Sequence, residues 1–266
     1  MKKLFTFALA AATLVGFSAC SNDEENALSD KGYINLNVTA DQIVATRADA
    51  DLTQWVAVVK SQATTNFVFG TAETKAVINP TTGTSLAATP LDAGTYEVTV
   101  SSHQSEEAAL AANEPYGEPY FEFQGKEVTV AAGSTTNESI ECGKAKNARF
   151  EIISSGFAGS ALTVTITDPR AITFSKADNT IGNAAFFTAE QELTLNINYT
   201  INDIPQTLTN KKFKLGGAGT NSKLTISSDQ NGYISLTITY DETFANGTSK
   251  TFEINTSNGE ATEKEP

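Results

Sequence analysis

The amino-acid sequence predicts an all-β protein made of two tandem β-sandwich domains, which follow a signal peptide and a short acidic tether. Three features carry that prediction. Apolar residues alternate with polar ones in many short runs, which is the period of half-buried strands. Turn sequences rich in Asn, Asp, Gly and Pro separate the runs. Helical periodicity is nearly absent, and many short, evenly spaced strands are typical of sandwiches and barrels.

Residues 1–19 have the three parts of a signal peptide. Two lysines precede an apolar stretch over 4–16, and small residues then lead to Cys20. The apolar stretch is too short to span a bilayer. Phe17-Ser18-Ala19-Cys20 resembles a bacterial lipobox, in which the cysteine becomes an acylated N-terminus. We therefore predict a lipoprotein anchored through Cys20; the alternative is an ordinary secretory signal followed by an incidental cysteine.

Residues 20–31 are predicted to be a lipid-anchored acidic tether. The run over 21–26 is polar and acidic, as expected of solvated chain rather than of a folded element. It is similar to the acidic export signal of Bacteroidetes lipoproteins that reach the outer face of the outer membrane, and the alternative is a plain linker. The expected location is the outer membrane, lipid-anchored and facing the cell exterior.

The predicted strands divide into an N-terminal sandwich over 32–157 and a C-terminal sandwich over 158–256. The segment 154–160 is the expected junction, and 257–266 is expected to be a charged tail without strands. In each strand the apolar residues share one face. These apolar sets are Ile34-Leu36-Val38, Tyr96-Val98-Val100, Phe150-Ile152, Leu162-Val164-Ile166, Leu193-Leu195-Ile197-Tyr199 and Ile234-Leu236-Ile238-Tyr240.

Turns and one short helix complete the expected elements. Asn231-Gly232 and Asn246-Gly247 are predicted hairpin turns, because a type I′ turn requires positive φ at both central residues. The segment 105–113 is the one plausible short helix. The glycine-rich segment 216–223 lacks the Gly-Lys-Ser/Thr ending of a phosphate loop and is predicted to be a long hairpin loop.

Charge and residue counts exclude several function classes. The 18 basic and 31 acidic residues give a net charge of −13, which repels nucleic acid. One histidine and two cysteines exclude zinc sites built from His and Cys, disulfide scaffolds, and any catalytic triad that does not use His103. We expect a protein that is not an enzyme, with no catalytic residues, no metal and no cofactor.

Some residues with chemical potential also have structural interpretations. His103 is predicted to be a solvated or hydrogen-bonded loop residue, because no triad spacing is visible. Cys142 is expected to be a small buried residue rather than a reactive thiol. Trp55, Tyr116 and Tyr120 are candidates for stacking on a sugar ring, and a core position is the favoured interpretation for Trp55.

Acidic pairs raise the question of calcium. Asp49 with Asp51, and Asp241 with Glu242, carry suitable oxygens. Neither pair has the dense ligand spacing of a calcium loop, so solvated carboxylates are expected.

Four motifs occur in a fixed order: Leu91-Asp92-Ala93-Gly94-Thr95-Tyr96, then Glu114-Pro115-Tyr116 with Pro119-Tyr120-Phe121-Glu122-Phe123, then Ala132-Gly133-Ser134-Thr135-Thr136, then Cys142 with Ala145 and Asn147. This set, spread over about residues 30 to 250, resembles the lipoprotein family of Bacteroidetes catalogued as domain of unknown function 4493. That family is similar in plan to the fimbrillin-like proteins. The resemblance implies two β-sandwiches on a lipid-anchored precursor that acts as a pilus subunit, tip or surface adhesin, and it implies no catalytic residue.

Arg47 is a candidate protease cleavage site under the same resemblance. In fimbrillin-like proteins a protease cuts after an arginine that follows the first strand, and a neighbouring subunit's strand fills the groove left behind. Arg47 lies between the strand expected at 33–38 and the strand expected at Trp55. The alternative is an exposed arginine in a polar loop.

The leading expectation is a lipid-anchored cell-surface protein, adhesin-like or accessory to fimbriae, without catalysis. One alternative is a polymerising pilus subunit assembled by strand exchange after cleavage at Arg47. Another is a glycan-capturing surface lipoprotein or hydrolase. The expected partners are outer-membrane lipid, through acylated Cys20, and either other fimbrial subunits or a host or glycan ligand. The sequence does not identify the ligand-binding residues.

Overall fold

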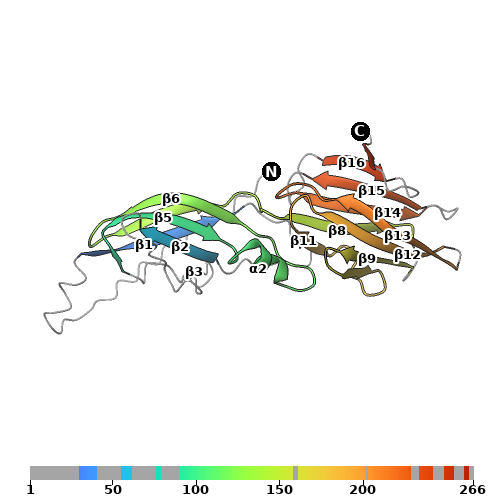
Figure 1. Cartoon of the computed structure of the whole chain (residues 1–266), viewed down its shortest axis with the longest axis horizontal. Coiled ribbons are helices and arrows are strands. Elements are labelled where there is room, and N and C mark those ends of the chain that lie inside the picture. The colour runs from blue at the N-terminus through green and yellow to red at the C-terminus, as the bar shows by residue number, and fades with distance from the viewer. Residues whose placement is uncertain are drawn as a thin grey trace.

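A computed structural model of the chain describes residues 30–40, 55–61, 76–78, 90–157, 161–201, 203–228, 234–241, 249–254 and 261–263. Two β-sandwiches follow one another along the long axis of the molecule (Figure 1). The all-β prediction with tandem sandwiches is therefore confirmed. Among the described residues, no helix has the length and apolar character needed to cross a bilayer.

The first sandwich packs a three-stranded sheet of order β4-β1-β7 against a four-stranded sheet of order β3-β2-β5-β6. The strands are β1 Lys31–Thr39, β2 Trp55–Ser61, β3 Ala76–Ile78, β4 Leu91–Asp92, β5 Gly94–Ser101, β6 Glu122–Val130 and β7 Thr135–Glu141. β1 is the middle strand of its sheet, antiparallel to β4 and parallel to β7. Ile34 of β1 packs with Tyr96, Val98 and Val100 of β5 in the core between the sheets.

The second sandwich packs a four-stranded sheet of order β10-β9-β12-β13 against a six-stranded sheet of order β11-β8-β14-β15-β16-β17. The strands are β8 Ala148–Ser155, β9 Leu162–Asp168, β10 Ile172–Ser175, β11 Ala184–Phe187, β12 Glu192–Ile201, β13 Ile204–Lys214, β14 Asn221–Ser228, β15 Ile234–Asp241, β16 Ser249–Ile254 and β17 Ala261–Glu263. Phe150 lies at the centre of the core, with its ring centroid 6.1 Å from that of Phe174 and 6.3 Å from that of Phe187.

β11 contributes side chains to both cores. Ala184 and Phe186 pack in the first core, while Ala185 and Phe187 pack in the second. Successive side chains of a strand point to opposite faces, so one short strand can serve two cores. The helix α2, Glu106–Ala111, lies at the same junction (Figure 1). Its N-terminus is closed by Ser105, whose side chain accepts the backbone N–H of Ala108.

The predicted alternation is confirmed for the strands β1, β5, β8, β9, β12 and β15, and the predicted helix over 105–113 is α2. The two predicted hairpin turns, at 231–232 and 246–247, lie outside the described residues. The strands that flank them pair antiparallel, β14 with β15 and β15 with β16.

Three features differ from the sequence-based expectation. β8 precedes the junction expected at 154–160, yet it pairs with β11 and β14, and its residues Ala148, Phe150 and Ile152 pack in the second core. The glycine-rich loop does not close a hairpin, because it carries the chain from β13 in one sheet to β14 in the other. The tail expected to lack strands contributes β17, which pairs with β16.

Candidate functional site

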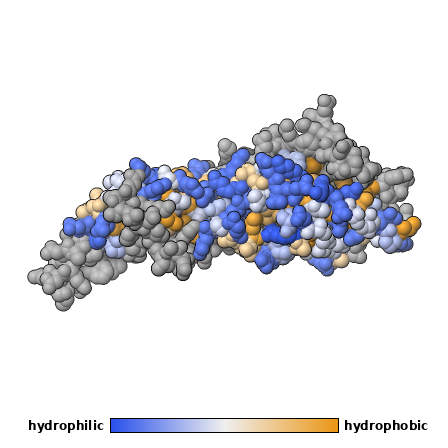
Figure 2. Space-filling view, in the orientation of Figure 1, coloured by the Kyte–Doolittle hydropathy of each residue, from blue (hydrophilic) through white to orange (hydrophobic). Residues whose placement is uncertain are grey.

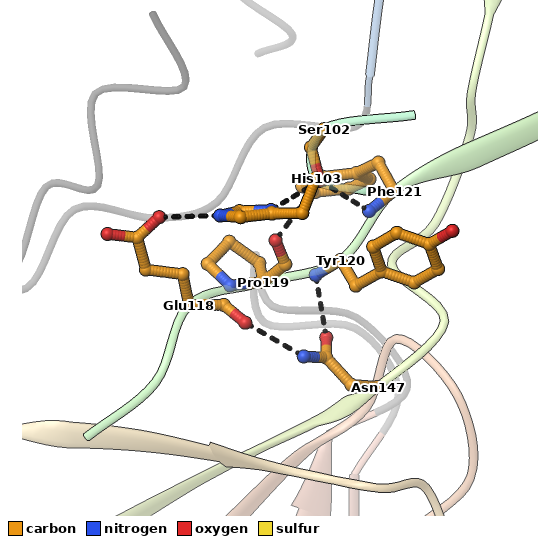
Figure 3. A network of polar contacts seen from close by, with 7 residues as sticks. All are labelled: Ser102, His103, Glu118, Pro119, Tyr120, Phe121 and Asn147. Carbon is orange, nitrogen blue, oxygen red and sulfur yellow. Dashed lines mark hydrogen bonds and ion pairs between the residues drawn. The ribbon is translucent and has the colours of Figure 1, made fainter. Parts of the chain in front are cut away.

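A network of polar contacts lies where the end of β5 meets the loop that leads into β6 (Figure 3). Nε2 of His103 lies 2.9 Å from Oε2 of Glu118, and its Nδ1 lies 3.1 Å from Oγ of Ser102. Ser102 is 5% exposed. Its Oγ accepts the backbone N–H of Phe121 at 2.9 Å and lies 3.3 Å from the carbonyl oxygen of Pro119. The prediction of a hydrogen-bonded loop histidine is confirmed.

Ser102, His103 and Glu118 have the composition of a catalytic triad but a different arrangement. In a Ser-His-acid triad the serine contacts Nε2 and the acid contacts Nδ1, which is the reverse of the contacts here. The serine hydroxyl is also buried among backbone groups. A neutral imidazole can donate from Nε2 and accept the hydroxyl at Nδ1, whereas a protonated one donates from both while the hydroxyl turns to Pro119.

Asn147 ties the same loop to the segment that enters β8 (Figure 3). Its side chain is fully buried. Oδ1 accepts the backbone N–H of Tyr120 at 3.0 Å, and Nδ2 donates to the carbonyl oxygen of Glu118 at 2.8 Å. The N–H of Lys146 donates to the carbonyl oxygen of Tyr120 at 2.7 Å. The oxygen and the nitrogen of the side-chain amide therefore both bond the loop before β6, which lies 27 to 29 positions earlier in the sequence.

Arg170, between β9 and β10, connects the two sandwiches. Nη1 donates to the carbonyl oxygen of Leu110 at 2.5 Å. Nη2 donates to the carbonyl oxygens of Tyr116 at 2.9 Å and Phe186 at 2.5 Å. The guanidinium carbon lies 4.8 Å from the ring centroid of Phe187, within the range of a cation–π contact. One side chain thus joins α2, the loop after it and β11.

The guanidinium of Arg170 is partly buried and lies close to Gly117. Burial lowers the pKa of its guanidinium, while Glu114 acts in the opposite direction. Gly117 has φ +73°, and a Cβ at that position would lie 3.0 Å from Nη2 of Arg170 and 3.2 Å from the carbonyl oxygen of Leu110. A glycine is therefore required there both by backbone conformation and by the approach of the guanidinium.

β1 is held in the first sandwich by contacts along its whole length. The N–H of Tyr33 donates to the carbonyl oxygen of Ser134 at 2.8 Å, and the N–H of Gly133 donates to that of Lys31 at 2.7 Å. β1 pairs with β7 without interruption, from Tyr33 opposite Thr135 to Thr39 opposite Glu141. The motif over 132–136 therefore holds β1 in place through backbone hydrogen bonds and strand pairing.

Side chains of β1 also contact its two neighbouring strands. Lys31 forms an ion pair with Asp92 of β4, and Nδ2 of Asn35 donates to Oδ1 of Asn137 on β7 at 2.9 Å. A Cβ on Gly32 would lie 2.3 Å from the carbonyl oxygen of Ala131, so the close approach of the two backbones requires glycine. β1 is therefore fitted closely to both of its neighbours.

Several residues singled out from the sequence lie outside the described residues: Cys20, Arg47, Asp49, Asp51 and Glu242. Trp55 begins β2, and its side chain is likewise not described. Asp241 ends β15. Within the described part of the chain, no group of three or more His, Cys, Asp or Glu side chains is arranged to hold a metal ion.

The candidate sugar-stacking tyrosines face inward. Tyr116 packs against the second core, with its ring centroid 5.9 Å from that of Phe174. Tyr120 is 6% exposed, and its hydroxyl donates to Oε1 of Glu122 at 3.0 Å. Phe121 lies in the first core and Phe123 packs against it. Tyr120 is therefore buried, and the ring of Tyr116 is partly covered by the second core.

Cys142 is buried in the first core, as predicted from the sequence. Burial raises the pKa of its thiol to about 11. A thiol that keeps its proton at neutral pH is a poor nucleophile, so the side chain behaves as a small apolar residue.

The sequence did not indicate Arg170, Ser102 or Glu118. Arg170 follows a turn sequence, which suggests an exposed residue, and its partners lie 16 to 60 positions away. Asn147 is the exception, because it belongs to the last of the four ordered motifs. Its place in that ordered motif was the available signal.

A family model described as "Domain of unknown function (DUF4493)" matches residues 30–256. No curated protein matches the chain.

Several solved structures share features with this chain at low identity. A candidate adhesin from Bacteroides ovatus is 8% identical with a TM-score of 0.36, and the match covers 88% of this chain and 96% of that one. A candidate cell adhesion protein from Bacteroides uniformis is 10% identical with a TM-score of 0.44, covering 79% and 98%. A fimbrial protein from Bacteroides ovatus is 11% identical with a TM-score of 0.34, covering 77% and 53%. At these scores the likeness establishes no function.

Proposed function

Since the chain belongs to the family described as domain of unknown function (DUF4493), we propose that it is a lipid-anchored, adhesin-like or accessory fimbrial protein on the outer face of the outer membrane, without catalytic activity. The lipobox-like sequence that ends at Cys20 supports the anchor. Two or three acyl chains hold a soluble domain at a membrane without a spanning helix.

The observation that carries this proposal is the position at which the chain enters the first sandwich. Lys31 pairs with Asp92, next to the start of β5, whereas the far end of β5 leads into α2 at the junction. β1 therefore begins at the end of the first sandwich that lies away from the second one (Figure 1). An anchor that precedes Lys31 would hold the first sandwich next to the membrane.

The second sandwich would then be the part presented to the surroundings. β12 pairs with β9 near the junction, at Thr194 opposite Asp168, and its hairpin with β13 closes between Ile201 and Ile204 at the other end. Hydrophilic residues dominate the described surface seen in Figure 2, with small apolar areas between them. Such a surface suits a soluble body held outside the cell.

The absence of catalysis is proposed because the one histidine has a structural role. His103 is bonded to a buried hydroxyl and to Glu118, and that hydroxyl also holds the backbone of Phe121. These contacts join the end of β5 to the loop that leads into β6.

One test of the surface proposal combines fractionation with protease treatment of intact cells. The wild-type protein should remain with the outer membrane and should be digested by protease added outside the cells. The Cys20→Ser variant should leave the membrane fraction, because its acyl chains are missing. Membrane retention of Cys20→Ser, or protection of the wild type from external protease, would contradict the proposal.

A second function is a pilus subunit assembled by strand exchange after cleavage at Arg47. The central position of β1 favours it, since removal of β1 would leave β4 and β7 with unpaired edges and uncover the pocket of Ile34 and Leu36. Strand-exchanged polymers resist unboiled SDS because they are kinetically trapped. A heat-sensitive ladder that disappears in Arg47→Ala would support this function, and a single monomer band would contradict it.

A further inference from the structure

β8 extends past the end of its partner β11. The ladder between them ends where Ala184 lies opposite Glu151. Asn183, the next residue of the chain toward the N-terminus, turns its N–H to the carbonyl oxygen of Thr180 at 3.1 Å. On its other side β8 remains paired with β14 as far as Ser155. Among the described residues, no strand covers the β11 side of residues 152–155.

Backbone groups of Ile152 and Ser154 point to this uncovered side. The N–H of Arg149 donates to the carbonyl oxygen of Thr220, on the side of β14, at 2.9 Å. Backbone groups of successive residues alternate between the two sides of a strand. The groups of Phe150, Ile152 and Ser154 therefore face the β11 side, and only Phe150 has a residue of β11 opposite it.

A groove of about 390 Å³ follows the uncovered edge. It is lined by residues 152–154 of β8 and by Lys176, Asn179, Ile181 and Gly182 from the segment between β10 and β11. Ile153, which also lines the groove, is 42% exposed. Among the described residues, the one other exposed large hydrophobic side chain is Ile204.

The lining of the groove indicates the chemistry of its occupant. Among the described residues that line it, Lys176 is the one charged residue, in a chain whose net charge is −13. Its ammonium group donates to the carbonyl oxygen of Phe157 at 2.6 Å and has two further N–H donors. None of the described residues that line the groove is aromatic, so they offer a sugar no stacking platform.

We propose that the edge of β8 over 152–155 binds an extended peptide segment of a partner protein as an added strand, with an acidic side chain directed at Lys176 and an apolar side chain against Ile153. Main-chain hydrogen bonds to Ile152 and Ser154 would supply affinity, and the side chains would supply selectivity. This site lies in the second sandwich and is independent of β1, of Arg47 and of the lipid anchor, so its test does not depend on the surface role proposed above.

The test measures binding of two fluorescent synthetic peptides to the purified full chain by anisotropy. The acidic probe is Thr-Val-Glu-Val-Thr, and the basic probe has Lys in place of Glu. The acidic probe should bind at least about tenfold more tightly than the basic one. Equal binding of the two probes, or no binding of the acidic probe, would overturn the proposal.

Two variants locate the site. Ser154→Pro removes the N–H that faces the groove, and proline is tolerated where a strand edge is unpaired. It should weaken binding at least about tenfold, whereas Ser154→Ala, which keeps the N–H, should bind as the wild type does. Lys176→Glu should reverse the preference between the probes. Unchanged binding by Ser154→Pro, or an unchanged preference in Lys176→Glu, would overturn the proposal, with thermal melting used to verify that both variants are folded.

Discussion

The guanidinium of Arg170, from the second sandwich, donates a hydrogen bond to the carbonyl oxygen of Leu110 in the last turn of α2, which belongs to the first. Carbonyl groups at the end of a helix have no partner within the helix. Arg170 supplies a donor for one of these carbonyl groups from another part of the chain. It also donates to the carbonyl oxygens of Tyr116 and Phe186. Arg170 therefore links the C-terminal end of α2 to the second sandwich.

Arg170→Met should destabilise the protein by about 2–4 kcal/mol, because it leaves three carbonyl oxygens without their charged donor. Urea unfolding followed by circular dichroism measures the change. Lys212→Met is the matched control, since its ammonium group pairs with Glu192 on the exposed surface. Equal stability of the two variants would show that the Arg170 contacts do not hold the sandwiches together.

Ile34→Ala should cost about 2–5 kcal/mol of unfolding free energy, because Ile34 is fully buried on the middle strand of its sheet. The neighbouring residue Asn35 faces the opposite side and bonds Asn137 at 2.9 Å. Asn35→Ala should cost about 1 kcal/mol or less. Similar losses in the two variants, measured by chemical denaturation, would mean that β1 is not packed as described.

Asn147→Asp should destabilise the protein by about 2–4 kcal/mol. The substitution replaces the Nδ2 donor with an oxygen that faces the carbonyl of Glu118, and it places a charge in a fully buried position. Asn137→Asp makes the same chemical change on the exposed face of β7 and should have little effect. A melting temperature of Asn147→Asp equal to that of Asn137→Asp would contradict the role given to Asn147.

The thiol of Cys142 should react slowly in the folded protein. Burial raises its pKa from 9.0 to about 11, which lowers the thiolate fraction at pH 8 about a hundredfold. Since the folded state keeps the proton to higher pH than the unfolded state, the stability that the thiol contributes is complete below pH 9 and is lost as pH rises through about 11. Alkylation of a Cys20→Ser protein, with and without denaturant, measures the difference. Equally fast labelling in both conditions would contradict burial of the thiol.

Local pattern was sufficient to predict much of the fold. The alternation of Ile34, Leu36 and Val38 predicted β1, and Ser105 ahead of two glutamates and an alanine-rich run predicted α2. These elements depend on residues close together in the sequence, where the period of the apolar side chains specifies the structure.

Other features depend on contacts between distant segments. Phe150 and Ile152 fit the core of either sandwich, so their alternation could not show that β8 pairs with β14. The partners of Arg170 come from three separate segments, and a single arginine after a turn carries no sign of them. Sequence patterns describe the face of a strand but not the strand beside it.

The N-terminus of the mature protein, determined by mass spectrometry on outer membranes of the native cells, tests the central claim most directly. A lipid-anchored surface protein that keeps β1 in its sheet should begin at Cys20 and carry acyl chains on that residue. A mature chain that begins at Ala48, directly after Arg47, would contradict this account, because β1 and the anchor would then both have been removed.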